Sequence, residues 1–173
     1  MININKNIVL IGMPGCGKTI IGKLLSDKLN VKFCDIDEYI VDNEGKSISE
    51  IFKNGEEHFR DIESKAVKEV SRNYPVIIST GGGVVKRVEN INILKENGVI
   101  IFINRPVEDI ISDVDVAKRP LLKDGKEKVY ELYEERYKLY KNYCDYEIIN
   151  NEDMDCAVNK LIDIIKYNIL GDE

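Results

Sequence analysis

The stretch Gly12-Met13-Pro14-Gly15-Cys16-Gly17-Lys18-Thr19 matches the pattern G-x-x-x-x-G-K-[ST] of a phosphate-binding loop, or P-loop, over its full length. An apolar run at residues 8–11 leads into it, and apolar residues at helical spacing follow it: Ile20, Ile21, Leu24, Leu25 and Leu29. The sequence therefore predicts a strand, a glycine-rich turn and a helix, in that order. In this arrangement the amides of the turn and the helix dipole together favour a bound phosphate. A chance match in a glycine-rich turn is the alternative, and the flanking strand and helix argue against it.

Two side chains of this loop are expected to carry chemistry. Lys18 is expected to reach the outer phosphates of the bound group, and Thr19 to bind a magnesium ion through its hydroxyl. Cys16 lies near the start of the predicted helix, where thiols can be activated. It is either a reactive cysteine or a small residue filling a compact loop, and we favour the second interpretation.

The composition narrows the class of protein. A chain of 173 residues has the size of one domain, which we place at residues 1–173. It has 25 lysines and arginines against 31 aspartates and glutamates, a net charge of −6, whereas proteins that bind duplex nucleic acid normally carry a basic surface. No apolar run approaches the roughly 20 residues of a membrane span, and the N-terminus has no signal-peptide pattern. We therefore expect a cytoplasmic monomer with no nucleic-acid or membrane partner.

The cysteine and histidine content supports this expectation. Cys16, Cys34, Cys144 and Cys156 form no C-x-x-C pair, and the single histidine, His58, offers no cluster of metal ligands. The pattern indicates reduced thiols in a cytoplasmic protein.

Strands and helices are predicted to alternate along the rest of the chain. Apolar runs predict strands at about residues 31–35, 76–80, 99–103 and 146–149, and the pattern from Ser47 to Glu50 is a capping box that begins a short helix. Helices are also expected at about 87–97 and 127–141, and we expect the charged segment 113–126 to be a mobile loop. This alternation predicts an α/β fold: a five-stranded parallel sheet flanked by helices, with its ligand site at the carboxyl ends of the strands.

Two motifs follow predicted strands and are expected to lie at that site. If the chain is still extended at Asp35-Ile36-Asp37, both carboxylates face the same side, so one can help to hold magnesium while the other meets a substrate hydroxyl. A solvated acidic turn that opens a helix is the alternative. The triplet Gly81-Gly82-Gly83 indicates close approach of the backbone to a ligand, although a flexible tight turn also fits.

Arginines and tyrosines also stand out. Arg60, Arg119 and Arg136 are three of only six arginines, and a planar guanidinium suits a bidentate grip on carboxylate or phosphate, although each also fits a surface position. Tyrosines at 130, 133, 137, 140 and 143 recur at helical spacing. This spacing favours a packed helix face over a platform for stacking bases.

Taken together, these residues resemble the shikimate kinase family, small P-loop kinases of aromatic amino-acid biosynthesis. The resemblance runs in order through nearly the whole chain. Besides the P-loop it rests on five motifs: Asp35-Ile36-Asp37 as D-x-D, Phe59-Arg60-Asp61-Ile62-Glu63 as F-R-x-x-E, Gly81-Gly82-Gly83, Arg119-Pro120-Leu121-Leu122 as R-P-L-L, and Arg136-Tyr137-Lys138-Leu139-Tyr140 as R-x-x-L-Y.

The resemblance implies the P-loop kinase fold and transfer of the γ-phosphate of ATP to the 3-hydroxyl of shikimate, which gives shikimate 3-phosphate and ADP. For ATP it implies binding by Gly15, Cys16, Gly17, Lys18, Thr19, Ile20 and Arg119. For Mg²⁺ it implies Thr19 and Asp35, with Ser79 nearby. For shikimate it implies Asp37, Arg60, Gly81, Gly82, Gly83 and Arg136. The catalytic residues would be Lys18, Asp37 as the candidate base, and Arg119 on a mobile lid at about residues 113–126.

The chain departs from the family pattern near the expected adenine site. The segment Ser112-Asp113-Val114-Asp115 lacks an arginine that often stacks on adenine, and the loop at residues 150–153 lacks a common proline. Three other functions are alternatives to that of a shikimate kinase. A different small-molecule kinase, such as a gluconate kinase, would not need two carboxylate-gripping arginines at these positions, and a GTPase-like switch would need an N-K-x-D motif that is absent. A nucleotide-binding module without catalysis is opposed by Lys18, Asp37 and Arg119.

Overall fold

The computed structural model describes residues 4–113 and 125–169. Within these ranges five strands form one sheet in the order β2-β3-β1-β4-β5, and every neighbouring pair is parallel. The strands are β1 (Asn7–Ile11), β2 (Lys32–Asp35), β3 (Val76–Ser79), β4 (Gly98–Asn104) and β5 (Tyr146–Ile149). The predicted five-stranded parallel sheet is confirmed.

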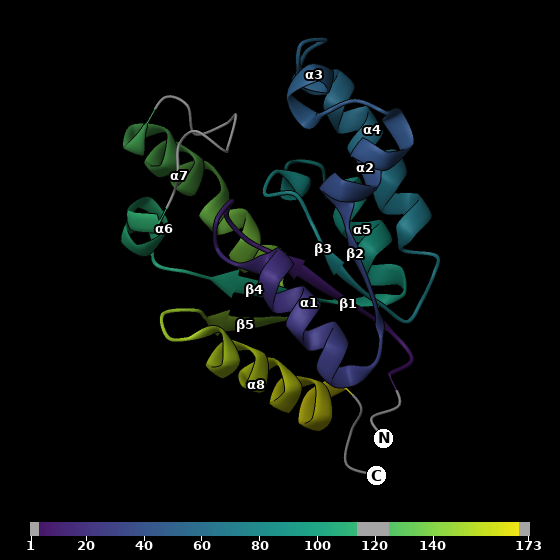
Figure 1. Ribbon diagram of the computed structural model, residues 1–173, viewed down its shortest axis with the longest axis vertical. Coiled ribbons are helices and arrows are strands. Elements are labelled where there is room, and N and C mark those ends of the chain that lie inside the picture. Colours follow the sequence, from purple (N-terminus) through teal and green to yellow (C-terminus); the bar gives the residue numbers. More distant parts are fainter. Residues whose placement is uncertain (1–3, 114–124, 170–173) are drawn as a thin grey trace.

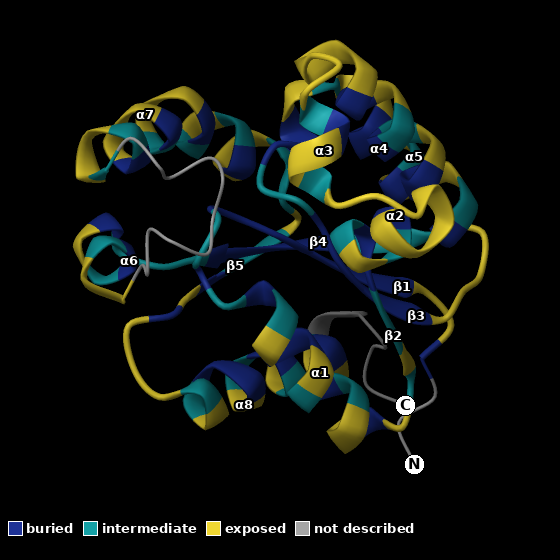
Figure 2. Ribbon diagram, turned by 45° about the horizontal axis from the view of Figure 1, so that its top comes forward, coloured by how far each residue is buried: buried dark blue, intermediate teal, exposed yellow. Residues whose placement is uncertain are grey.

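Helices cover both faces of this sheet (Figures 1 and 2). One face is covered by α1 (Lys18–Leu29) and α8 (Met154–Ile164), which is followed by η4 (Ile165–Ile169), and the other by α4 (Glu56–Val70), α5 (Val88–Glu96) and α7 (Lys126–Tyr143). Shorter helices complete the described structure: α2 (Ile36–Glu44), α3 (Ile48–Phe52), η1 (Val84–Lys86) and α6 (Val107–Asp113). No helix in the described ranges combines the length and the apolar character needed to cross a bilayer.

The central strand β1 shows that the sheet is covered on both faces. All five of its residues are buried, and it pairs with β3 on one side and β4 on the other. Strands that are covered on both faces read as continuous apolar runs, as residues 8–11 do. In Figure 2 the strands are mostly dark blue, while the outer sides of the helices are yellow.

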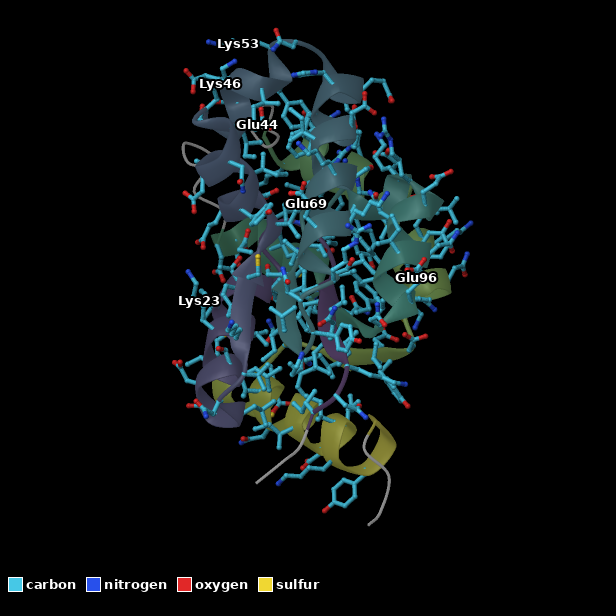
Figure 3. The ribbon with its side chains drawn as sticks, turned by 90° about the vertical axis from the view of Figure 1, so that its right-hand side faces the viewer. Lys23, Glu44, Lys46, Lys53, Glu69 and Glu96 are labelled. Carbon is cyan, nitrogen blue, oxygen red and sulfur yellow. The ribbon has the colours of Figure 1, made fainter. Side chains whose placement is uncertain are left out.

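Charged side chains lie on these outer sides. Figure 3 shows Lys23 on α1, Glu69 on α4 and Glu96 on α5, with Glu44, Lys46 and Lys53 around α2 and α3. Side chains of both signs therefore lie on the solvent-facing sides of these helices.

The structure corrects two details of the helix predictions. Ile20 is 56% exposed, because the buried stripe of α1 is formed by Ile21, Leu25 and Leu29, and Ile20 lies about 100° around the axis from Ile21. The tyrosine face of α7 is only partly packed. Tyr140 is fully buried, whereas Tyr130 is 44% exposed.

A buried asparagine that the sequence did not single out joins the sheet to the connection after α4. Asn7 is fully buried at the start of β1, where its Nδ2 donates to the Ser71 carbonyl at 2.8 Å and its Oδ1 accepts from the Val76 amide at 3.0 Å. One side chain therefore satisfies two buried backbone groups at the edge where β3 begins.

We expect Asn7→Ala to lower the free energy of unfolding by about 2–3 kcal/mol, because it leaves a buried carbonyl and a buried amide without partners. Urea unfolding measures this. As a control, Asn43→Ala removes an exposed asparagine that donates to the Tyr39 carbonyl, and it is expected to change stability by about 0.5 kcal/mol or less. Equal effects of the two variants would contradict the role assigned to Asn7.

Candidate active site

The P-loop has the strand, turn and helix context that the sequence predicts. It connects β1 to α1, and Gly12, Gly15 and Gly17 have φ values of +147°, +85° and +102°, which side chains rarely adopt. Lys18 is 7% exposed, and its Nζ donates to the carbonyls of Gly12 at 2.8 Å and Met13 at 2.9 Å. The Lys18 side chain therefore lies over the P-loop. To bind a phosphate it would have to leave these two carbonyls.

Two residues that the sequence analysis did not assign hold the outer side of this loop. Arg105 Nη1 donates to the Gly15 carbonyl at 3.1 Å, and Asn150 Nδ2 donates to the Cys16 carbonyl at 2.9 Å. Arg105 also pairs with Asp113. Because protein donors bind the carbonyls of the loop, its conformation is fixed before any ligand arrives. Both residues directly follow strands, β4 and β5, and the rule that ligands gather at strand ends was the signal that could have found them.

A set of oxygen donors lies beside the start of α1. Thr19 Oγ1 donates to Asp35 Oδ2 at 2.7 Å and lies 3.4 Å from Ser79 Oγ. Hydroxyl and carboxylate oxygens are the ligands that Mg²⁺ prefers, and P-loop enzymes use this residue pair. The donor set therefore fits a magnesium ion.

The expected extended geometry at Asp35-Ile36-Asp37 is wrong. The strand ends at Asp35, whose Oδ1 caps α2 by accepting from the amides of Asp37 at 3.0 Å and Glu38 at 3.3 Å. The helix cap replaces the extended backbone that was expected, because an aspartate at this position satisfies the free amides at the start of a helix. Asp37 therefore lies in the first turn of α2. The acidic turn does open a helix, but Asp35 is buried and Asp37 is half-buried, so the turn is not the solvated one of the alternative interpretation.

Asp37 faces a buried acidic neighbour across Gly81. A Cβ atom on Gly81 would lie 2.9 Å from Glu63 Oε1 and 3.2 Å from Asp37 Oδ1, and both oxygens are buried without a hydrogen-bond partner. Burial, and next the charge of Asp35, raise the pKa of Asp37 to about 6 against the opposing effect of Lys18 and Arg60. Burial also raises the pKa of Glu63, although Arg60 opposes it. Glycine at position 81 keeps the space between the two carboxylates open.

Arg60 is buried on α4 with part of its guanidinium free. Its Nη1 donates to Glu63 at 2.7 Å, and its Nε and Nη2 donate to Glu56 Oε1 at 3.3 and 3.2 Å. A guanidinium has five N–H donors, so one N–H remains on each terminal nitrogen for a further anion. A Cβ atom on Gly83 would lie 2.1 Å from Arg60 Nη2. Glycine is therefore required at position 83 for the guanidinium to lie there.

Arg136 is the more unusual cation. It is 2% exposed, and its Nε and Nη1 are buried without hydrogen-bond partners, with Glu135 Oε2 at 3.7 Å from Nε. One turn further along α7, Tyr140 donates to the Gly82 carbonyl at 2.5 Å and so ties this helix to the glycine triplet. A buried guanidinium with two nitrogens left without hydrogen bonds is costly, which indicates that an anionic ligand completes the site.

The structure thus gathers most of the predicted site residues at the carboxyl ends of β1, β2 and β3. Arg119 and most of the lid predicted at about 113–126 lie outside the described residues. Ile20 is described, and its side chain is exposed rather than packed in the site. Glu63 and Tyr140 lie inside the motifs quoted above, but no site role was expected for Glu63 and only a packing role for Tyr140, because only the fold shows what they touch.

Comparisons with known proteins match most of the chain to a single family. The family model described as shikimate kinase matches residues 14–166. A shikimate kinase from Clostridium beijerinckii is 51% identical over 94% of this chain and 96% of its own, and one from Clostridium botulinum is 52% identical over 93% and 98%. Among solved structures, a shikimate kinase from Acinetobacter baumannii in complex with shikimate superposes with a TM-score of 0.90 at 31% identity, covering 95% of both chains. One from Aquifex aeolicus has a TM-score of 0.81 at 35% identity over 96% of this chain and 99% of the other.

The parallel sheet, its P-loop and its structural neighbours place the chain among the P-loop kinases. The chain belongs to the shikimate kinase family, and its activity is ATP-dependent phosphorylation of shikimate.

The raised pKa of Asp37 predicts a stability gain when its charge is removed. Above pH about 6 the carboxylate is ionised in both the folded and the unfolded protein, and the folded state bears the full cost of burying it; below pH about 4 it is protonated in both, and the cost is absent. We expect Asp37→Asn to raise the free energy of unfolding by about 1–2 kcal/mol at pH 7.5, with a gain that shrinks toward pH 4.

Urea unfolding between pH 4 and 8, without magnesium or nucleotide, measures this gain. Asp42→Asn, an exposed change on the same helix, is the control, and we expect it to shift stability by about 0.5 kcal/mol or less at every pH. A destabilised Asp37→Asn protein at pH 7.5 would contradict the prediction.

Proposed function

We propose that this chain transfers the γ-phosphoryl group of ATP to the 3-hydroxyl of shikimate through the residues described above, with Mg²⁺ bound beside Thr19. The proposal is carried by one observation: two buried arginines, Arg60 and Arg136, have free N–H groups, and Oδ1 of Asp37 is buried without a hydrogen-bond partner. Such a site is complementary to a ligand with both an anionic group and a hydroxyl donor.

At the nucleotide end, the P-loop amides and Lys18 would bind the phosphates. The carbonyls that Lys18 now binds are weaker partners for an ammonium than a phosphate anion, so phosphate can displace them. Thr19 and Asp35, with Ser79 nearby, would hold the magnesium ion. That ion would supply charge neutralisation across the β- and γ-phosphates.

At the acceptor end, Arg60 and Arg136 would hold the carboxylate of shikimate, and Gly81, Gly82 and Gly83 would let its ring hydroxyls approach the backbone. The 3-hydroxyl oxygen would then bond to the γ-phosphorus while the bond from that phosphorus to the bridging oxygen of ADP breaks. Asp37 Oδ1 would orient the hydroxyl and accept its proton. Most of the acceleration would come from positioning and from cations around the moving phosphoryl group.

The role of Arg119 remains part of the proposal. It would approach the transferring phosphoryl group on the lid at about residues 113–126, and closure would exclude water that could otherwise accept the phosphate. We further propose that residues 1–173 act as one domain and a monomer in the cytoplasm, without nucleic-acid or membrane partners. The net charge of −6 and the four free thiols support this setting.

Acceptor choice tests the proposal directly. ADP release is measured with shikimate, gluconate and nucleoside monophosphates offered in parallel at equal concentrations, with ATP and magnesium. We expect turnover with shikimate alone. Turnover with gluconate and none with shikimate would overturn the acceptor assignment while leaving the kinase fold intact.

Substitution of the two arginines tests the carboxylate grip. A charge-assisted hydrogen bond contributes roughly 1.5–3 kcal/mol, so Arg136→Ala and Arg60→Ala should each raise the KM for shikimate about ten- to a hundredfold. The KM for ATP should barely change. Arg60→Lys keeps the charge but loses the planar fork, so it should still be impaired. Unchanged use of shikimate by all three variants would rule out the grip.

A further inference from the structure

A single lysine links the two arginine helices. Lys86 belongs to η1, which packs against both α4 and α7 and lies between them (Figure 1). Its Nζ lies 2.8 Å from Glu56 Oε1 on α4 and 3.1 Å from Glu135 Oε1 on α7. The lysine therefore holds one carboxylate from each of two helices that are distant in the sequence.

Each of these glutamates in turn adjoins one of the buried arginines. Glu56 accepts from Nε and Nη2 of Arg60 through the same oxygen that Lys86 binds, and Glu135 Oε2 lies 3.7 Å from Arg136 Nε. The ion pairs thus run from Arg60 through Glu56, Lys86 and Glu135 to Arg136. We call this set of five residues the arginine bridge.

We propose that Lys86 is a positioning residue for acceptor binding, which keeps Arg60 and Arg136 available to the carboxylate of the substrate. The inference rests on the proposed function and adds a residue that does not itself touch the substrate. Its basis is the charge balance around the two guanidinium groups, since Glu56, Glu63 and Glu135 all lie beside them. Lys86 binds the two glutamates that are partly exposed, whereas Glu63 is fully buried.

Removal of Lys86 has a specific consequence at Arg136. Glu135 would lose the Lys86 cation, and among the described residues it would keep an ion pair with Arg136, whose Nε is 3.7 Å away and has no hydrogen-bond partner. A carboxylate that closes this gap would occupy the donors that the substrate needs. The substrate would then compete with a tethered anion, and its own negative charge would lie near two glutamates that no longer have the Lys86 cation.

The bridge contributes to binding rather than to folding. The side chains of Lys86, Glu56 and Glu135 are 30%, 46% and 44% exposed, and ion pairs at such exposure contribute little to the free energy of unfolding. A small change in stability together with a clear change in acceptor affinity is therefore the signature of this role.

The chain supplies a matched control in the next residue. Arg87 also pairs with two carboxylates of α4, with Nη2 at 2.7 Å from Glu57 and Nη1 at 2.8 Å from Asp61. Neither carboxylate is part of the arginine bridge. Arg87→Met thus removes the same kind of surface ion pair from the same helix without altering Arg60 or Arg136.

The experiment compares Lys86→Met, Lys86→Arg and Arg87→Met with the wild type, by steady-state kinetics and by calorimetric titration of shikimate. Loss of two partly exposed pairs predicts an increase of about three- to tenfold in the KM and Kd for shikimate in Lys86→Met, with the KM for ATP unchanged. Lys86→Arg should restore most of the affinity, since it keeps the charge. Arg87→Met should match the wild type.

A double variant separates competition from structural damage. If Glu135 becomes the competing anion, Glu135→Gln in the Lys86→Met background should recover much of the lost shikimate affinity, whereas general damage would leave it unchanged or make it worse. The inference is overturned if Lys86→Met and Arg87→Met have equal shikimate constants, or if Glu135→Gln gives no recovery. Failure of the proposed function is a different result, because the wild type would then not phosphorylate shikimate at all.

Discussion

The parallel register of β2, β3 and β1 is the constraint on which the site depends. Asp35 pairs with Ser79 across β2 and β3, and Ser79 pairs with Leu10 across β3 and β1, so the three strands end on one line. The chain leaves that line as the P-loop, as helix α2 and as the glycine triplet. Parallel strands bring their carboxyl ends to the same edge, and this edge therefore receives residues that are distant in the sequence. A slip of one residue in either pair would turn Asp35 or Ser79 to the other face.

Several charged side chains near this edge have buried atoms without hydrogen-bond partners in the folded protein. Asp37 and Glu63 each have a buried oxygen without a hydrogen-bond partner, and Arg136 has two buried nitrogens in the same condition. Each arrangement costs folding free energy, and a sheet that is covered on both faces provides the stability that tolerates it. In the proposed complex the substrate would supply missing partners, so its binding would recover part of this cost.

The sequence was sufficient for the fold and for the residue types of the site. Continuous apolar runs located the strands, and the fifth one, Tyr146–Ile149, was predicted to the residue. The prediction failed where local and long-range effects compete. Asp35 was expected to be extended, but its side chain caps α2 because two free amides lie within reach. Ile20 follows the apolar periodicity of its neighbours, yet it lies outside the buried stripe.

The bonding partners of individual side chains in distant segments could not be predicted from the sequence, even where a position after a strand indicated nearness to the site. Asn7 resembles any polar residue before a strand, and only the path of the chain from α4 to β3 shows that two backbone groups need it. Arg105 and Asn150 reach the P-loop across 90 and 134 residues of sequence. Lys86 follows the glycine triplet but belongs to no sequence motif. Its position between two helices is therefore visible only in the three-dimensional structure.

The geometry of the two arginines also bears on which hydroxy acid the site prefers. Arg60 and Arg136 come from different helices, both are almost completely buried, and Glu63 fixes one of them directly. A carboxylate held between them would have little freedom, and Asp37, the proposed base, is held in place by the start of α2. An open-chain hydroxy acid would have to lose several rotations to present a hydroxyl at that one place, whereas a ring carries its carboxylate and hydroxyl at a set separation. Rigid placement of the binding groups therefore favours a cyclic acceptor such as shikimate over a flexible one such as gluconate, even though both carry a carboxylate.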